Sequence, residues 1–339
     1  MSLQDFTNNI KIFVSNLYKS YNKLDFINKL FIIFLLLLFS CVILKNIKNK
    51  KENFKNDEIG TNKANYSKKF DNQTYDKYFS NKYDNIYLNP KRNDFEIKKI
   101  KEFANKDSSK ILDIGCGTGY NINTLTKDGY NITGIDQSKD MINTIKKTYD
   151  NCNVINQDIL NATSLTYNDY DIITCLGRTL YEIKDKETFF ENCYSLLEDN
   201  GLLIINVVDR EKFKPYDQNT NSKNVLFNPE KYNKYIDTII VKFNNKLEFT
   251  SKYNNLYDKS NDDKYDMTNN KSLPYASYLE EFTNFANSNP VNKKYERHLY
   301  IPKKEIIKKL AESKGFSFDN KIYLNNIGLD NEYLYIFRK

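Results

Sequence analysis

The stretch that decides the fold covers residues 111–120 and reads ILDIGCGTGY. It begins within a short apolar run, Lys110–Ile114, which is typical of a buried strand. Three glycines at alternate positions follow the run. Glycine has no Cβ where a backbone presses against a ligand, and it adopts backbone angles that other residues avoid. We therefore predict a ligand-binding turn between a strand and a helix.

A nicotinamide dinucleotide is not the ligand that this turn favours. The fingerprint G-x-G-x-x-G would require a glycine at position 120, where this chain has Tyr120. Asp113 also precedes the glycines. The pattern disfavours dinucleotide binding.

Strands and helices alternate along the chain on both sides of the turn. Further strands are predicted at residues 131–136, 153–156, 171–176 and 202–208, and helices at residues 184–198 and from Ser138 onward. Strands separated by helices imply a parallel sheet with right-handed crossovers. Residues 316–324 and 332–338 add a C-terminal antiparallel hairpin. We expect an α/β fold with a doubly wound, mostly parallel, seven-stranded sheet.

Residues 211–301 interrupt the alternation. Residues 236–243 and 246–253 flank Asn244-Asn245, which suits a two-residue hairpin turn, and residues 275–285 predict a third strand. Pro302 then opens a helix that Gly315 closes. The insertion predicts a β-rich lid over a substrate site.

The glycine turn resembles motif I of the class I S-adenosylmethionine-dependent methyltransferases, and the spacing downstream agrees with that family. The resemblance implies a Rossmann-like domain over residues 71–339, with S-adenosylmethionine as cofactor. It also implies that Asp136 accepts hydrogen bonds from the ribose hydroxyls, that Gln137 lies beside the adenine, and that Asp158 and Ile159 meet the adenine edge. Residues 176–177 would lie near the methionine end, and Tyr75 and Tyr83 would belong to a helical cap over the cofactor. The predicted cofactor-binding residues are Asp113, Gly115, Cys116, Gly117, Gly119, Asp136, Gln137, Asp158, Ile159 and Leu176.

The sequence does not identify the catalytic residues. A sulfonium methyl donor is already activated, so the protein mainly positions the acceptor, and a base is required only if the acceptor must lose a proton. His298, the single histidine, is one candidate base, although a lone histidine is more often a packing or surface residue. Tyr181 and Glu182 follow a strand at the rim where substrates enter such sheets, and Arg178 could pair with a carboxylate.

Charge and cysteine content exclude several other classes. The net charge of +7 comes from 51 basic residues, only five of which are arginine, the residue that nucleic-acid readers prefer. The segment after residue 176 also lacks the [N/D]-P-P-[Y/F] motif of enzymes that methylate DNA bases. Nucleic acid is therefore an unlikely partner. Five cysteines without a CxxC pair argue against a metal site or a disulfide framework and fit a reducing compartment.

An uncharged apolar run, residues 30–44, contrasts with the mean hydropathy of −0.69 of the whole chain. Extended back to residue 26, it would span about 28 Å as a helix, close to the ~30 Å hydrocarbon core of a bilayer. We expect an amphipathic segment at residues 1–25, a transmembrane helix at 26–44 and a Lys/Asn-rich tether at 45–70. Lysines after the run favour a single-pass protein whose C-terminal part faces the cytosol. A buried core helix is the alternative, and a cleaved signal peptide fits less well.

The leading functional hypothesis is a membrane-anchored methyltransferase. Its partners would be the bilayer, through residues 26–44, and a small-molecule, lipid or membrane-associated protein acceptor. One alternative is a membrane-tethered protein that binds the cofactor, or acts as a scaffold, without catalysis. A third reading is a related aminopropyl transferase, for which the acidic polyamine pocket is not visible.

Overall fold

A computed structural model describes residues 25, 28, 68–214, 225–228, 238–244, 246–285 and 291–339. The chain divides into two compact units, residues 1–64 and 65–339. In the first unit, the backbone N–H and the side-chain amide of Asn28 each donate to the Asp25 carboxylate over 2.8 Å. Apart from Asp25 and Asn28, the predicted amphipathic segment at 1–25 and the predicted transmembrane helix at 26–44 lie outside the described residues, as does most of the predicted tether. Among the residues that are described, no helix has the length and apolar character needed to cross a membrane.

A seven-stranded sheet with the order β12-β13-β6-β5-β2-β3-β4 organises the second unit. Its strands are β2 (Lys110–Ile114), β3 (Asn131–Asp136), β4 (Asn153–Asn156), β5 (Tyr170–Cys175), β6 (Leu197–Val208), β12 (Ser317–Tyr323) and β13 (Glu332–Arg338). The first five strands are parallel, whereas β13 runs antiparallel to both β6 and β12. The predicted mostly parallel sheet with a C-terminal hairpin is confirmed.

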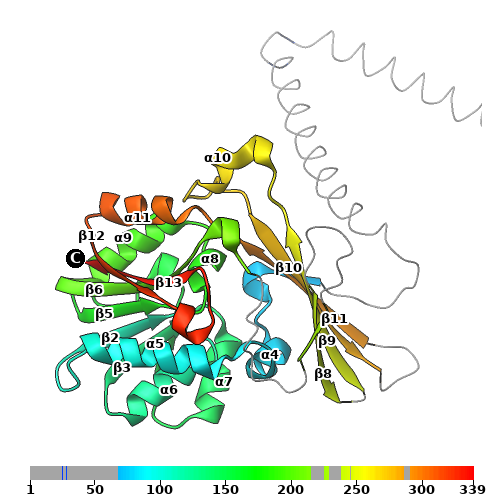
Figure 1. Cartoon of the computed structure of the whole chain (residues 1–339), viewed down its shortest axis with the longest axis horizontal. Helices are drawn as coiled ribbons and strands as arrows, with labels where there is room; N and C mark the ends of the chain where they lie inside the picture. The colour runs from blue at the N-terminus through cyan, green and yellow to red at the C-terminus, as the bar shows by residue number, and fades with distance from the viewer. Residues whose placement is uncertain are drawn as a thin grey trace, which may run out of the picture. The chain divides into compact units, whose positions relative to one another are not determined.

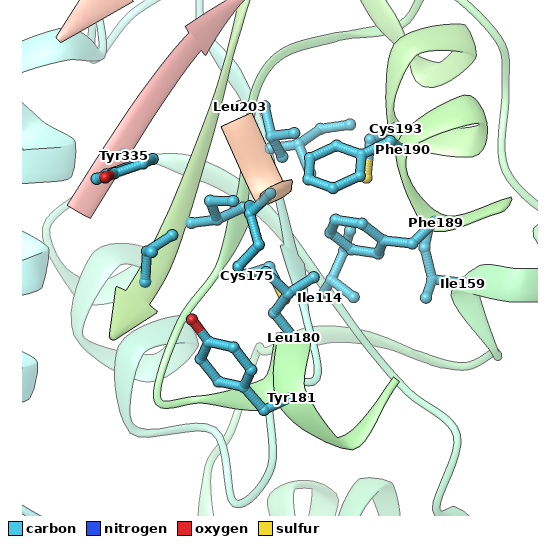
Figure 2. Close-up of a cluster of buried hydrophobic side chains, with 14 of the residues drawn as sticks. Ile114, Ile159, Cys175, Leu180, Tyr181, Phe189, Phe190, Cys193, Leu203 and Tyr335 are labelled. Carbon is cyan, nitrogen blue, oxygen red and sulfur yellow. The ribbon is translucent and has the colours of Figure 1, made fainter. Parts of the chain in front are cut away.

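Helices cover both faces of this sheet (Figure 1). The helices α5 (Pro90–Phe103), α6 (Tyr120–Lys127) and α7 (Lys139–Thr148) lie on one face, and α9 (Lys186–Leu196) and α11 (Lys304–Ser313) lie on the other. Successive strand residues point to opposite faces, so Ile172 and Ile173 belong to different hydrophobic clusters. Figure 2 shows Phe189, Phe190 and Cys193 of α9 packed near Leu203 of β6. Both faces are therefore buried, which explains why these strands read as continuous apolar runs.

Local signals mark the start of α7 and the end of α11, whereas α11 begins at Lys304, two residues after the predicted Pro302. The Ser138 hydroxyl accepts a hydrogen bond from the Met141 N–H over 3.1 Å at the start of α7. Gly315 has a φ of +102°, in the left-handed region, just after α11. The helix predicted at residues 184–198 is shorter, because the Asp185 carboxylate caps α9 by accepting from the Thr188 N–H over 3.1 Å.

A second sheet has the order β1-β11-β10-β9-β8-β7. Its strands are β1 (Lys68–Phe70), β7 (Val225–Asn228), β8 (Thr238–Asn244), β9 (Leu247–Asn255), β10 (Ala276–Asn284) and β11 (Val291–Leu299). The antiparallel hairpin of β8 and β9 matches the predicted one. The prediction that the tether runs to residue 70 was wrong at its end, because Lys68 pairs with Lys294 in a parallel β1–β11 ladder. The sequence analysis did not predict the strand β11, because charged side chains interrupt its apolar pattern.

Short helical elements connect these layers. They are η1 (Asp71–Gln73), α3 (Lys77–Ser80), α4 (Tyr83–Tyr87), η2 (Ile159–Asn161), α8 (Thr179–Glu182), η3 (Arg210–Lys212), η4 (Lys259–Asn261), α10 (Asp262–Tyr265) and η5 (Asn325–Ile327). The segment from η1 to α4 packs on the second sheet, where Phe79 and Ile86 join a hydrophobic cluster with Phe249 and Phe282. Residues 71–87 therefore bring the second sheet to the strand ends of the first.

Candidate active site

A cavity of about 430 Å³ lies at the carboxyl ends of the parallel strands. One wall comes from the turns that follow β2, β3, β4 and β5. The opposite wall comes from residues 71–83 and from the end of β11 and the residues after it. Its lining residues include Asp71, Tyr75, Tyr83, Gly115, Gly117, Asp136, Gln137, Asp158, Ile159, Gly177, Glu182, Lys184, Arg297, His298 and Tyr300. Ligands of open α/β sheets bind in this position, outside the carboxyl ends of the strands.

The glycine turn forms the floor of the cavity. The N–H groups of Gly115 and Cys116 donate to the Ile135 carbonyl oxygen over 2.8 and 3.0 Å, which fixes the turn against β3. Gly115 and Gly117 have φ values of +68° and +55°. A Cβ added at Gly115 would lie 2.3 Å from Thr179 Cγ2, whereas one added at Gly117 would meet nothing within 4 Å. Gly117 therefore presents bare backbone to the cavity.

Asp136 ends β3 beside this turn. Its Oδ2 accepts a hydrogen bond from the Gly117 N–H over 3.0 Å, and its Oδ1 accepts from the Ser138 N–H over 2.8 Å. Burial raises the pKa of Asp136 to about 7, against the lowering effect of these two bonds. The carboxylate is held in one orientation and offers its remaining acceptor sites to a ligand.

The turn after β4 forms the next part of the wall. The Asp158 Oδ1 accepts from the Leu160 N–H over 2.9 Å, which holds the carboxylate at the start of η2. Gln137, Ile159 and Gln157 line the same cavity. The sequence did not single out Gln157, because a polar residue after a short strand carries no signal of its own. Six predicted cofactor residues thus line one cavity: Gly115, Gly117, Asp136, Gln137, Asp158 and Ile159.

The other four predicted cofactor residues do not line the cavity. Asp113 is buried beneath the turn, where the Thr174 hydroxyl donates to its Oδ1 over 2.6 Å. Cys116 points its sulfur over β3, since a Cβ on Gly134 would lie 2.9 Å from Cys116 Sγ. Gly119 begins α6, where an added Cβ would lie 2.8 Å from Ile145. Leu176 packs in the core, and its neighbour Gly177 lines the cavity instead.

Of the four candidate catalytic residues, two line the cavity and two do not. Tyr181 is fully buried, and its hydroxyl accepts from the Val208 N–H over 2.8 Å, so its placement at the rim was wrong. Figure 2 shows it among the core side chains. Arg178 forms an ion pair with Glu332 and is absent from the cavity wall. Glu182 and His298 do line the cavity.

His298 is held by carboxylates on both sides of its ring. Its Nδ1 lies 2.9 Å from Asp71 Oδ1, and its Nε2 lies 3.7 Å from Glu296 Oε1. The hydrogen bond with Asp71 raises the pKa of His298 above its ordinary value. These contacts favour the protonated imidazolium, which is not a base.

Tyr75 connects the two walls of the cavity. Its carbonyl oxygen accepts from the Ser138 hydroxyl over 2.6 Å, next to Asp136, and its own hydroxyl donates to Glu182 Oε1 over 2.6 Å. The ring of Tyr83 lies edge-on to the ring of Tyr75 at 6.0 Å. Burial raises the pKa of both phenols well above their ordinary value. Both tyrosines therefore line the cavity as neutral phenols.

Arg297 of β11 is a site residue that the sequence reading missed. Its guanidinium binds Glu280 of β10 through two hydrogen bonds, Nε to Oε2 over 2.9 Å and Nη2 to Oε1 over 2.7 Å. Its third nitrogen, Nη1, donates to Glu182 Oε1 over 2.7 Å. A single arginine in a polar strand gives no local signal, because only the fold brings these two glutamates to it.

Comparisons with known proteins match the part of the chain that carries the predicted cofactor-binding residues. A family model described as a methyltransferase domain matches residues 111–201. The chain is 33% identical over 129 residues to a ubiquinone biosynthesis O-methyltransferase of Rickettsia bellii, covering 37% of this chain and 53% of that protein. The Coxiella burnetii protein of the same description is 32% identical over 133 residues, covering 38% and 54%. The chain thus spans about half the length of the curated relatives it matches.

Solved structures agree over most of the chain. The CcbJ methyltransferase from Streptomyces caelestis superposes with a TM-score of 0.57 at 11% identity, covering 79% of this chain and 98% of that one. An S-adenosylmethionine-dependent methyltransferase from Clostridium acetobutylicum gives a TM-score of 0.53 at 18% identity, covering 77% and 97%. At these identities the likeness concerns the fold. Sheet order, glycine turn and family match together show that the chain carries a class I S-adenosylmethionine-dependent methyltransferase domain with a Rossmann-like fold.

Proposed function

We propose that the protein transfers a methyl group from S-adenosylmethionine to a small-molecule, lipid or membrane-associated protein acceptor. The observation that supports this most directly is the Asp136 carboxylate, fixed by the Gly117 and Ser138 N–H groups at the floor of the cavity. A bound cofactor supplies an activated methyl group on a sulfonium. The protein then has to hold an acceptor in line with that methyl group, which is a task of positioning.

The residues on the strand-end wall fit this cofactor. Asp136 would accept hydrogen bonds from the two ribose hydroxyls, and Asp158 would accept one from the adenine amine. Gly117 leaves room that any Cβ would fill, because nothing lies within 4 Å of the Cβ position there. The curated relatives named above are O-methyltransferases by description, which supports methyl transfer. Their similarity covers about half of their length, so the acceptor is argued separately.

The test of this function uses Asp136→Ala. Removing the carboxylate should weaken S-adenosylmethionine binding by roughly tenfold or more, because two charge-assisted hydrogen bonds are lost. Calorimetric titration of the full chain measures the affinity, and labelled cofactor with fractionated host lysate measures turnover. Affinity and turnover should fall together. Asp150→Ala, an exposed substitution outside the cavity, is the matched control.

Two other outcomes would count against an enzyme. If the wild-type protein binds the cofactor and transfers no label to any lysate fraction, the alternative of a tethered cofactor-binding protein or scaffold is favoured. If it binds no cofactor, methyl transfer is excluded.

We also propose that residues 26–44 anchor the protein in a membrane as a single pass, with the methyltransferase domain facing the cytosol. The support is the uncharged apolar run and the lysines that follow it. Deleting residues 1–50 should move the protein from the membrane pellet to the supernatant. Methyl transfer by both forms should then be compared on membrane and soluble fractions. Equal transfer by both forms, to soluble material alone, would contradict a membrane-bound acceptor.

A further inference from the structure

Two carboxylates that line the cavity lie outside the predicted cofactor residues: Asp71, which pairs with His298, and Glu182. Glu182, at the end of α8, has a side chain 27% exposed, and it lines the cavity. Its Oε1 accepts from both the Tyr75 hydroxyl and Arg297 Nη1, over 2.6 and 2.7 Å. These two donors anchor Oε1, and Oε2 is left to accept a further hydrogen bond.

The charge of Glu182 is only partly compensated. Arg297 binds Glu280 through two hydrogen bonds and Glu182 through one, so a single guanidinium serves two carboxylates. Glu280 is 2% exposed and faces away from solvent. This cluster therefore presents a net negative charge at Glu182.

The histidine that lines the same cavity is not poised to deprotonate a hydroxyl. Both ring nitrogens of His298 face carboxylates, Asp71 and Glu296. The negative charge of Glu182 also contributes to raising the pKa of the Tyr83 phenol, after the larger effect of burial. A phenol bound at the same place would be kept neutral by the same field, and a neutral phenol is a poor nucleophile.

We propose that Glu182 binds the nucleophilic group of the methyl acceptor, and that this group is a primary or secondary amine. This inference rests on the proposed methyltransferase function. An ammonium donates one proton to Oε2 of Glu182, from which it passes to water. The freed nitrogen lone pair forms the new bond to the methyl carbon while the electrons of the carbon–sulfur bond return to sulfur. Tyr75 and Arg297 are positioning residues that hold the carboxylate.

A binding experiment tests the carboxylate without knowledge of the acceptor. S-Adenosylhomocysteine lacks the methyl group, whereas sinefungin has a carbon bearing a primary ammonium in place of the methylated sulfur. If Glu182 faces the position of the transferred methyl, the full chain should bind sinefungin about tenfold more tightly than S-adenosylhomocysteine. In Glu182→Gln this ratio should fall to near one, while the affinity for S-adenosylhomocysteine changes little.

Two variants control this ratio. Glu191→Gln makes the same chemical change at a carboxylate that pairs with Lys314 on the surface, and its ratio should equal that of the wild type. Asp158→Asn should weaken both ligands by the same factor. A wild-type ratio near one, or an unchanged ratio in Glu182→Gln, overturns the role of Glu182 and leaves the proposed function intact. If neither ligand binds the wild-type protein, the function and this inference fail together.

A second arm tests the amine itself. Host-cell extract is acetylated and then treated with hydroxylamine, which restores hydroxyls and leaves amines blocked. Label transferred from S-adenosylmethionine by the wild-type protein should fall at least tenfold relative to mock-treated extract. Label that persists in the amine-blocked extract overturns the amine assignment.

Discussion

At the residue scale, two aspartates with the same shifted pKa have different surroundings. Burial raises the pKa of Asp113 and of Asp136 to about 7. Asp136 receives two backbone N–H groups at the cavity floor, whereas Asp113 receives the Thr174 hydroxyl beneath the glycine turn. Asp113 therefore supports the turn from below and does not touch the cavity. Its ionisation has an energetic cost, because the carboxylate has lost its hydration.

This cost predicts a pH-dependent effect of Asp113→Asn. The pKa of about 7 in the folded protein exceeds the ordinary 3.8, so the folded state binds more protons between these values and its stability falls as the pH rises. The variant removes this loss. Its melting temperature should match the wild type near pH 4 and exceed it by a few degrees at pH 8. This corresponds to a free energy of unfolding that is higher by about 1 to 2 kcal/mol.

Thermal unfolding at several pH values measures this difference, with the exposed Asp150→Asn as control. A difference that does not change with pH would show that Asp113 ionises without penalty in the folded protein.

At the element scale, the turn between β2 and α6 uses its glycines for separate purposes. Gly115 is needed because Thr179 of α8 occupies the place of a Cβ, at 2.3 Å from its Cγ2. Gly117 has the same left-handed backbone, with a φ of +55°, but faces open space. The first glycine thus serves packing between elements, and the second serves the ligand.

Alanine at each position should separate these purposes. Gly117→Ala should cost about 1 kcal/mol of backbone strain and weaken S-adenosylmethionine binding at least tenfold, because its Cβ enters the cavity. Gly115→Ala should lower the melting temperature further. Thr179→Ala in that background should recover part of the loss, since it removes the two nearest atoms. Calorimetry and thermal unfolding measure both effects. Equal loss of stability in the two single variants would contradict this division.

At the scale of the whole molecule, buried charges join the two sheets. Arg297 of β11 and Glu280 of β10 are 6% and 2% exposed, and Arg297 also reaches Glu182 of α8 and the hydroxyl of Tyr75. The guanidinium lies over the ring of Tyr278 at 4.9 Å. The wall opposite the cofactor residues therefore depends on one ion pair with several partners.

Removing one member of the Arg297–Glu280 ion pair should destabilise the folded protein. Arg297→Met leaves the Glu280 carboxylate buried without its guanidinium, and should lower the free energy of unfolding by about 3 kcal/mol. Adding Glu280→Gln removes the uncompensated charge and keeps an acceptor for the Tyr87 hydroxyl, so the double variant should recover most of the loss. Urea denaturation compares the three proteins. A double variant no more stable than Arg297→Met would mean that the charge of Glu280 is not the cause.

The sequence by itself determined the seven-stranded sheet, the glycine turn and the carboxylates that follow β3 and β4. These features rest on local physics, because strands buried on both faces must be continuously apolar and a backbone that touches a ligand in the left-handed region favours glycine. The turn and the strand ends follow one another closely along the chain, so their order predicts their place.

Only the tertiary structure decided the other wall of the cavity. The strands β1 and β11 read as polar, and Arg297 meets partners 115 and 222 residues away, Glu182 and Tyr75. It also decided that Tyr181 is buried while its neighbour Glu182 lines the cavity. A charged residue becomes part of a core only when distant partners satisfy it, and no local pattern records partners that far apart.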